Sequence, residues 1–105
     1  MAKTNVKKII QAYARELSKT GISFEHLYLF GSYATNKNTR WSDIDVLVTT
    51  KKNLEKDYLN YKKNLRHALL NVDTRIEPHA CTVDDFKNGE TLPAIEAKRY
   101  GIKIV

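Results

Sequence analysis

Apolar residues recur at steps of three and four in two long segments, residues 4–17 and residues 54–72. This spacing places them on one side of a helix, so each segment is predicted to form an amphipathic helix with one buried face. The apolar positions of the first helix are Val6, Ile9, Ile10, Tyr13, Ala14 and Leu17, and those of the second are Leu54, Tyr58, Tyr61, Leu65, Ala68, Leu69 and Val72. Gly21, after the first helix, favours its termination there.

Three shorter segments have the pattern of strands. Residues 26–31 (HLYLFG) are dense in aromatic and branched side chains, which is typical of a short buried strand. Residues 43–50 (DIDVLVTT) alternate, with two acids and Leu47 on one face and Ile44, Val46 and Val48 on the other. Residues 74–81 (TRIEPHAC) form the third segment, and Pro78 indicates an edge strand because proline cannot donate to the ladder.

The C-terminal part predicts two short helices and a final strand. Thr82 with an acid at Asp85 is typical of a helix start, and Asn88-Gly89 is expected to end that helix. A last helix is predicted over residues 93–100, with Pro93 in its first turn, Gly101 after its end and a short strand over residues 102–105. We therefore expect one α/β (α+β) domain over residues 1–105, a small mixed sheet with helices packed on one face and the acid-bearing face open.

The composition limits the partners and the cellular compartment that we expect for this domain. The net charge of +6 favours polyanionic partners, but the lysines are spread along the chain, so nucleic acid is not favoured as the primary ligand. The single cysteine, Cys81, excludes an internal disulfide and fits a reducing compartment. The sequence contains no apolar run near ~20 residues and no secretory signal, so we expect a cytoplasmic protein that does not interact with membranes.

The chemistry is concentrated between residues 31 and 45. A strand ends at Gly31-Ser32, and after ten residues Asp43 and Asp45 appear one residue apart at the head of the next strand. Two carboxylates this close repel each other, and a cation between them relieves the repulsion. We interpret that cation as Mg²⁺ carrying a nucleoside triphosphate. Gly31 would let the backbone approach the phosphates, and Ser32 would offer a hydroxyl and an N–H group.

Gly31-Ser32, ten residues and Asp43-Ile44-Asp45 together resemble the pattern of minimal nucleotidyltransferases in the polymerase β-like superfamily. The apolar residues before Gly31 and after Asp45 also agree, and Ser42 completes the Ser-Asp-Ile-Asp form common in that family. The resemblance covers most of the chain. It implies the nucleotidyltransferase fold, a two-metal Mg²⁺ site and ATP as the donor of AMP.

A third acid normally completes such a site from the next strand, and Glu77 is our choice because it lies in mid-strand beside the apolar Ile76. Asp73, just before that strand, is the alternative. The predicted metal ligands and catalytic residues are therefore Asp43, Asp45 and Glu77. The predicted nucleotide-binding residues are Gly31, Ser32, Ser42 and Arg40.

His79 shares a face with Glu77 in an extended chain. It could touch the nucleotide or the acceptor, but we interpret it as an ordinary hydrogen-bonded surface histidine.

We expect another chain to supply the acceptor. Larger relatives carry a second domain for the acceptor, and the 105 residues of this sequence leave no room for such a domain. Resemblance to the small family members implies a partner of the HEPN ribonuclease-toxin type, with this chain as the antitoxin that attaches AMP to one of its hydroxyl groups. A homo-oligomer is the other partner considered. Two further hypotheses remain: a non-catalytic partner-binding or nucleotide-sensing module, and a nucleic-acid-binding subunit driven by the positive charge.

Overall fold

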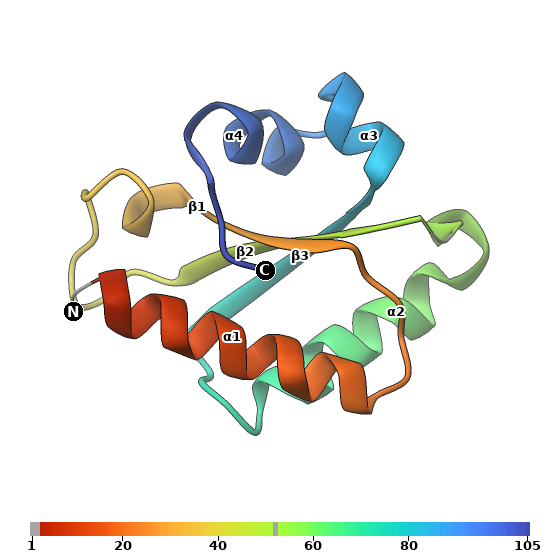
Figure 1. Ribbon diagram of the computed structural model, residues 1–105, viewed down its shortest axis with the longest axis horizontal. Coiled ribbons are helices and arrows are strands. Elements are labelled where there is room, and N and C mark those ends of the chain that lie inside the picture. Colours follow the sequence, from red (N-terminus) through yellow and green to blue (C-terminus); the bar gives the residue numbers. More distant parts are fainter. Residues whose placement is uncertain (1–2, 52) are drawn as a thin grey trace.

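The computed structural model describes residues 3–51 and 53–105. Five helical segments and four strands follow one another along the chain (Figure 1). In order they are α1 (Lys3–Lys19), β1 (His26–Phe30), the 3₁₀ turn η1 (Gly31–Tyr33), β2 (Ile44–Thr50), α2 (Leu54–Leu69), β3 (Ile76–Thr82), α3 (Val83–Asn88), α4 (Leu92–Tyr100) and β4 (Ile102–Lys103).

The strands form one mixed sheet in the order β3-β2-β1-β4. β1 runs antiparallel to both β2 and β4, whereas β2 and β3 are parallel and connected through α2. β3 is therefore an edge strand, as Pro78 predicted. β2 begins at Ile44, one residue later than expected, so Asp43 lies just outside it.

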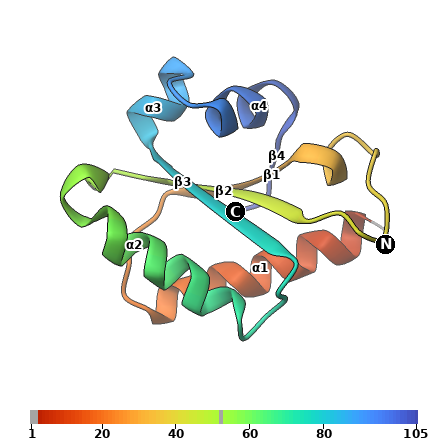
Figure 2. The same ribbon diagram turned by 180° about the vertical axis from the view of Figure 1, so that it is seen from behind.

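α1 and α2 cover one face of the sheet (Figure 2). Their predicted apolar positions belong to the same core cluster as Ile44, Val46 and Val48, except for Tyr58, which is exposed. Tyr13 of α1 donates a hydrogen bond to the Leu65 carbonyl of α2 at 2.8 Å, which joins the two helices within this layer.

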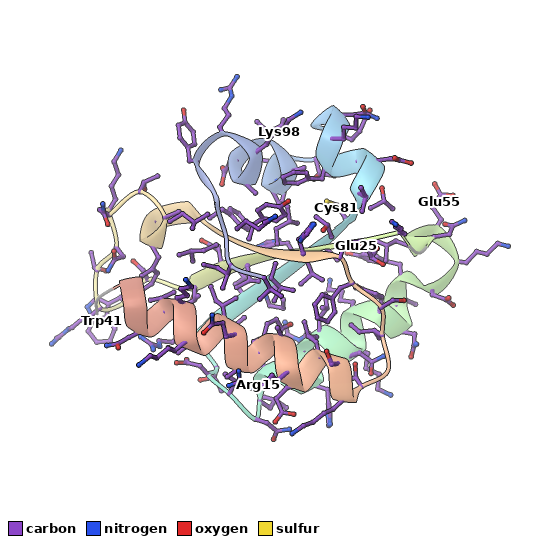
Figure 3. All side chains as sticks on the ribbon, viewed as in Figure 1. Arg15, Glu25, Trp41, Glu55, Cys81 and Lys98 are labelled. Atoms are coloured by element: carbon purple, nitrogen blue, oxygen red, sulfur yellow. The ribbon has the colours of Figure 1, made fainter. Side chains whose placement is uncertain are left out.

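The prediction that helices pack on one face only is wrong. α3 and α4 lie on the opposite side of the sheet from α1 and α2 (Figures 1 and 2). A second, smaller apolar cluster fills the space beneath them: Phe30, Leu47 and Cys81 from the sheet, with Ala94 and Ala97 from α4. Cys81 lies beneath this layer in Figure 3. The reason is that Leu47 and Cys81 are apolar on the same face as the acids, and they are buried only if helices cover that part of the face.

The boundaries of the C-terminal helices agree with the predicted caps. Thr82 accepts a hydrogen bond from the backbone N–H of Asp85, and Gly89 takes the left-handed conformation that ends α3. Thr91, a cap that was not predicted, accepts from the N–H of Ala94, and α4 begins at Leu92, one residue before the expected start. Among the described residues, the longest apolar stretches fall short of what a membrane-crossing helix requires.

Candidate active site

The register of the sheet brings the predicted acids together. Asp45 of β2 lies between Phe30 of β1 and Glu77 of β3, in one row across three strands. Residues paired across neighbouring strands point to the same face, so the Asp45 and Glu77 side chains are neighbours. In the next row His79 pairs with Leu47, which places its ring diagonally from Asp45.

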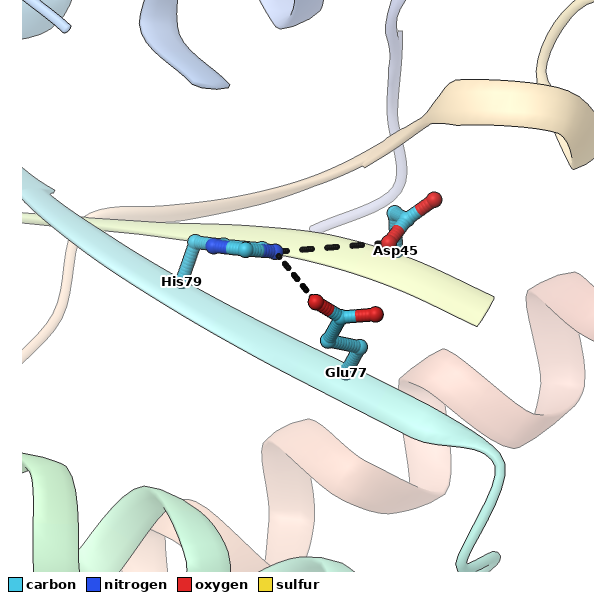
Figure 4. A group of neighbouring side chains, drawn as sticks. All are labelled: Asp45, Glu77 and His79. Carbon is cyan, nitrogen blue, oxygen red and sulfur yellow. Dashed lines mark ion pairs between the residues drawn. The ribbon is translucent and has the colours of Figure 1, made fainter. Parts of the chain in front are cut away.

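Asp45, Glu77 and His79 form a compact group of potential metal ligands (Figure 4). His79 Nε2 lies 3.6 Å from Glu77 Oε1 and 4.0 Å from Asp45 Oδ1. One ligand atom from each residue lies within 4.8 Å of the others. These separations are too long for good hydrogen bonds, but atoms that share a metal at about 2.0–2.1 Å lie about 3–4 Å apart. The two distances from His79 fall in this range, so small side-chain movements would bring the three ligand atoms around one cation.

Gly31 closes the site from the side of β1. Its φ of +74° lies in the left-handed region, which glycine adopts without strain. A Cβ at this position would collide with the Asp45 carboxylate. Glycine is therefore required twice here, once by the backbone conformation and once by the close approach to Asp45.

This arrangement disfavours the ionised form of Asp45. Burial raises the pKa of its carboxyl to about 6, with further contributions from the negative charges of Glu77, Asp43 and Glu96. The side chain is only 24% exposed, whereas that of Glu77 is 51% exposed. A cation bound here would relieve this repulsion and favour the ionised carboxylate.

Asp43 lies one residue before β2 and is exposed. It is not part of the group that already lies within metal-ligand distance. Its negative charge nevertheless raises the pKa of Asp45, and together with Glu77 it lines a groove along β3. Asp43 is thus near the cluster but outside its tightest part.

Of the two candidates for the third acid, only Glu77 lies beside Asp45. Asp73 precedes β3, and Arg75 occupies both of its carboxylate oxygens, with Nε 3.1 Å from Oδ1 and Nη2 2.7 Å from Oδ2. These hydrogen bonds hold the pKa of Asp73 below its usual value. Asp73 is therefore engaged in shaping the turn before β3.

The predicted nucleotide-binding residues separate into two groups. Ser32 is partly exposed and follows Gly31, which lies against Asp45, within η1. Ser42 instead accepts a hydrogen bond from the Thr39 N–H at 2.9 Å and stabilises the turn before β2. Arg40 lies 4.7 Å from the ring centre of Trp41, whose side chain is 80% exposed and projects from the surface in Figure 3.

Two residues near the cluster were missed or misread in the sequence. His79, interpreted as a surface histidine, is only 31% exposed, faces both acids and has its ring 5.4 Å from that of Phe30. Its place on the face of Glu77 was the available signal. Glu96 of α4 reaches the site only because α4 packs over this face, and no local pattern marks it.

The comparisons with known proteins agree with this geometry. The chain matches the family model described as "Nucleotidyltransferase domain" over residues 6–104. Its fold is similar to the crystal structure of a Sulfolobus solfataricus protein provisionally named a nucleotidyltransferase. The TM-score is 0.61 at 13% sequence identity, and the similarity covers 95% of this chain and 79% of the other. A search of curated proteins found no match.

Proposed function

Since this chain belongs to the nucleotidyltransferase domain family, we propose that it is a Mg²⁺-dependent enzyme that transfers AMP from ATP to a hydroxyl group of a partner protein. The observation that carries the proposal is the junction of Gly31 with the Asp45–Glu77 pair. A glycine turn and two carboxylates on adjacent strands meet at one point.

Asp45 and Glu77 would hold the metal, with Asp43 as an additional oxygen ligand at the rim. Mg²⁺ prefers oxygen ligands and is usually bound by one or two carboxylates plus substrate phosphates. When bound, Mg²⁺ would supply positive charge against the triphosphate and the reacting oxygens.

The other steps fall to the residues of the chain. Gly31 leaves room at this turn for the Asp45 carboxylate, and Ser32 would offer its hydroxyl and N–H to the β- and γ-phosphates. We assign to the half-exposed Glu77 carboxylate the role of accepting the proton of the acceptor hydroxyl. The acceptor oxygen then bonds to the α-phosphorus, the bond from that phosphorus to the β-phosphate bridge breaks, and pyrophosphate leaves.

The partner proposed is a ribonuclease toxin of the HEPN type, which this chain would neutralise as an antitoxin. Support comes from the Gly-Ser and Asp-Ile-Asp pattern, which resembles the small family members. The choice of ATP has the same support.

The test is to incubate the purified chain with the partner, Mg²⁺ and each of the four nucleoside triphosphates, and to measure intact mass. We expect the partner to gain AMP, and ATP to be preferred. Asp45→Asn should abolish the product, whereas Asp84→Asn, at an exposed acid on α3, should retain it. Full neutralisation of the partner by Asp45→Asn without any adduct would instead support a non-catalytic module.

A further inference from the structure

The free edge of β3 forms the floor of a groove that begins at the proposed catalytic acids. The groove encloses about 530 Å³ and is lined by Asp43 and Glu77 as well as by residues of α2 and the start of α4. Its volume lies within the range of about 300–1,000 Å³ that is typical of ligand sites. In Figure 2 the outer edge of β3 faces the viewer, with α2 below it and α3 and α4 above it.

From this arrangement we propose that the groove binds an extended, acidic segment of the partner protein and presents its hydroxyl to Glu77. This proposal rests on the proposed function and identifies the acceptor side of the same site. The segment would lie beside β3 as an added strand, with its acidic side chains toward α2.

The backbone of β3 is suited to such a strand. Ile44 N–H bonds to the Arg75 carbonyl on the inner side of the β2–β3 pair. Main-chain groups alternate in direction along a strand, so those of Pro78 and Ala80 point to the outer edge. Within residues 3–51 and 53–105, no other strand pairs with that edge. Pro78 offers only a carbonyl there, which limits indiscriminate strand pairing and leaves selection to side chains.

The charges of the groove differ between its α2 side and the end near the acids. Arg75 also lines the groove, but its guanidinium is paired with Asp73. Lys62 and Arg66, one helical turn apart on α2, are exposed and line it. Neither forms an ion pair within the described residues, while Lys62 lies 5.8 Å from the ring centre of Tyr58. Asp43 and Glu77 provide the negative charge. A segment with acidic side chains against α2 and a neutral hydroxyl near Glu77 would match both the cations of α2 and the acids at the end of the groove.

The same charge pattern disfavours a nucleic acid strand. RNA carries a phosphate at every nucleotide, so a bound strand would bring negative charge to the acids as well as to α2. A peptide can carry its charge on one part only. We therefore favour a protein segment.

The experiment uses four labelled twelve-residue peptides, each with a central tyrosine. The four peptides differ in the residues that flank the tyrosine. These residues are acidic on the N-terminal side in the first peptide, acidic on the C-terminal side in the second, neutral in the third and basic in the fourth. Binding to the chain is measured by fluorescence anisotropy with Mg²⁺ and a non-hydrolysable ATP analogue. We expect one acidic peptide to bind about tenfold tighter than the basic one, as two partly exposed charge pairs allow.

A charge-swapped variant provides the control. Lys62→Glu combined with Arg66→Glu should reverse the preference toward the basic peptide. Lys56→Glu with Lys63→Glu makes the same change of net charge on exposed α2 positions outside the groove, and should leave the preference unchanged.

Three results would overturn the proposal: equal binding of all peptides, equal effects of the two double variants, or displacement of the acidic peptide by an RNA oligonucleotide that binds more tightly. AMP transfer to the peptides is measured separately. Binding with the predicted charge preference but without transfer would contradict the proposed function and leave the groove assignment intact. AMP transfer that does not depend on peptide charge would contradict the groove assignment and leave the proposed function intact.

Discussion

Gly31 and Asp45 depend on each other, and substitution of the glycine should show it. Gly31→Ala would force a side chain into a left-handed backbone position and against the Asp45 carboxylate. We expect destabilisation of about 1–3 kcal/mol, together with loss of Mg²⁺-ATP binding. Urea denaturation and calorimetric titration with Mg²⁺ and an ATP analogue would measure the two effects.

Gly21 provides a matched control. It has a similar φ of +84°, but no atom lies within 4 Å of where its Cβ would be. Gly21→Ala should therefore cost only the backbone strain and leave ligand binding unchanged. Equal effects of both substitutions on binding would show that the contact with Asp45 is unimportant.

The raised pKa of Asp45 makes stability depend on pH. The pKa of Asp45 is about 6 in the folded protein, against an ordinary value of 3.8, so the folded state holds this proton more tightly than the unfolded state. The associated stability is present below about pH 4 and is lost as the pH rises through 6. Asp45→Asn should therefore stabilise the metal-free protein by about 1–2 kcal/mol more at pH 7.5 than at pH 4.

The measurement for Asp45→Asn is urea denaturation in the presence of a chelator at both pH values. Asp84→Asn, on exposed α3, should show no such difference between them. A benefit of Asp45→Asn that does not change with pH would mean that burial and the neighbouring acids disfavour the ionised Asp45 less than the structure indicates.

Between elements, the contact of α1 with α2 depends on a buried hydroxyl. Tyr13 is fully buried, and its hydroxyl donates to the Leu65 carbonyl; burial raises the pKa of the phenol. Tyr13→Phe should cost about 1 kcal/mol, since it removes one net hydrogen bond without leaving a cavity. Thermal or urea denaturation would measure the loss. Tyr100→Phe, at an exposed position, should be neutral, and an equal loss there would contradict this interpretation.

Across the whole molecule, the two helical layers differ in how firmly they are held. α3 has no buried residue and α4 has only Ala94 and Ala97, whereas α1 and α2 contribute large side chains to the main core. Hydrogen exchange followed by mass spectrometry should therefore show faster exchange in α3 and α4 than in α1 and α2. Leu47→Ala, beneath the smaller layer, should accelerate exchange in α3 and α4 first. A uniform increase over all helices would instead indicate a single cooperative unit.

The local pattern of residues determined most of the elements. Helical spacing predicted α1 and α2, alternation assigned Ile44, Val46 and Val48 to the core, and Pro78 marked β3 as an edge strand. These features depend on side-chain period and on backbone hydrogen bonding, which are properties of neighbouring residues. The Gly31-Ser32 and Asp-Ile-Asp pattern similarly indicated the family.

Only the tertiary structure decided which distant side chains meet. The register of β2 against β3 placed Glu77 and His79 beside Asp45, while a local pair with Arg75 engaged Asp73. Packing of α4 over the acid face brought Glu96 near Asp45 and left a groove along β3. These contacts join residues far apart in the chain, so they depend on how the layers pack, which the spacing of residues within one element does not specify.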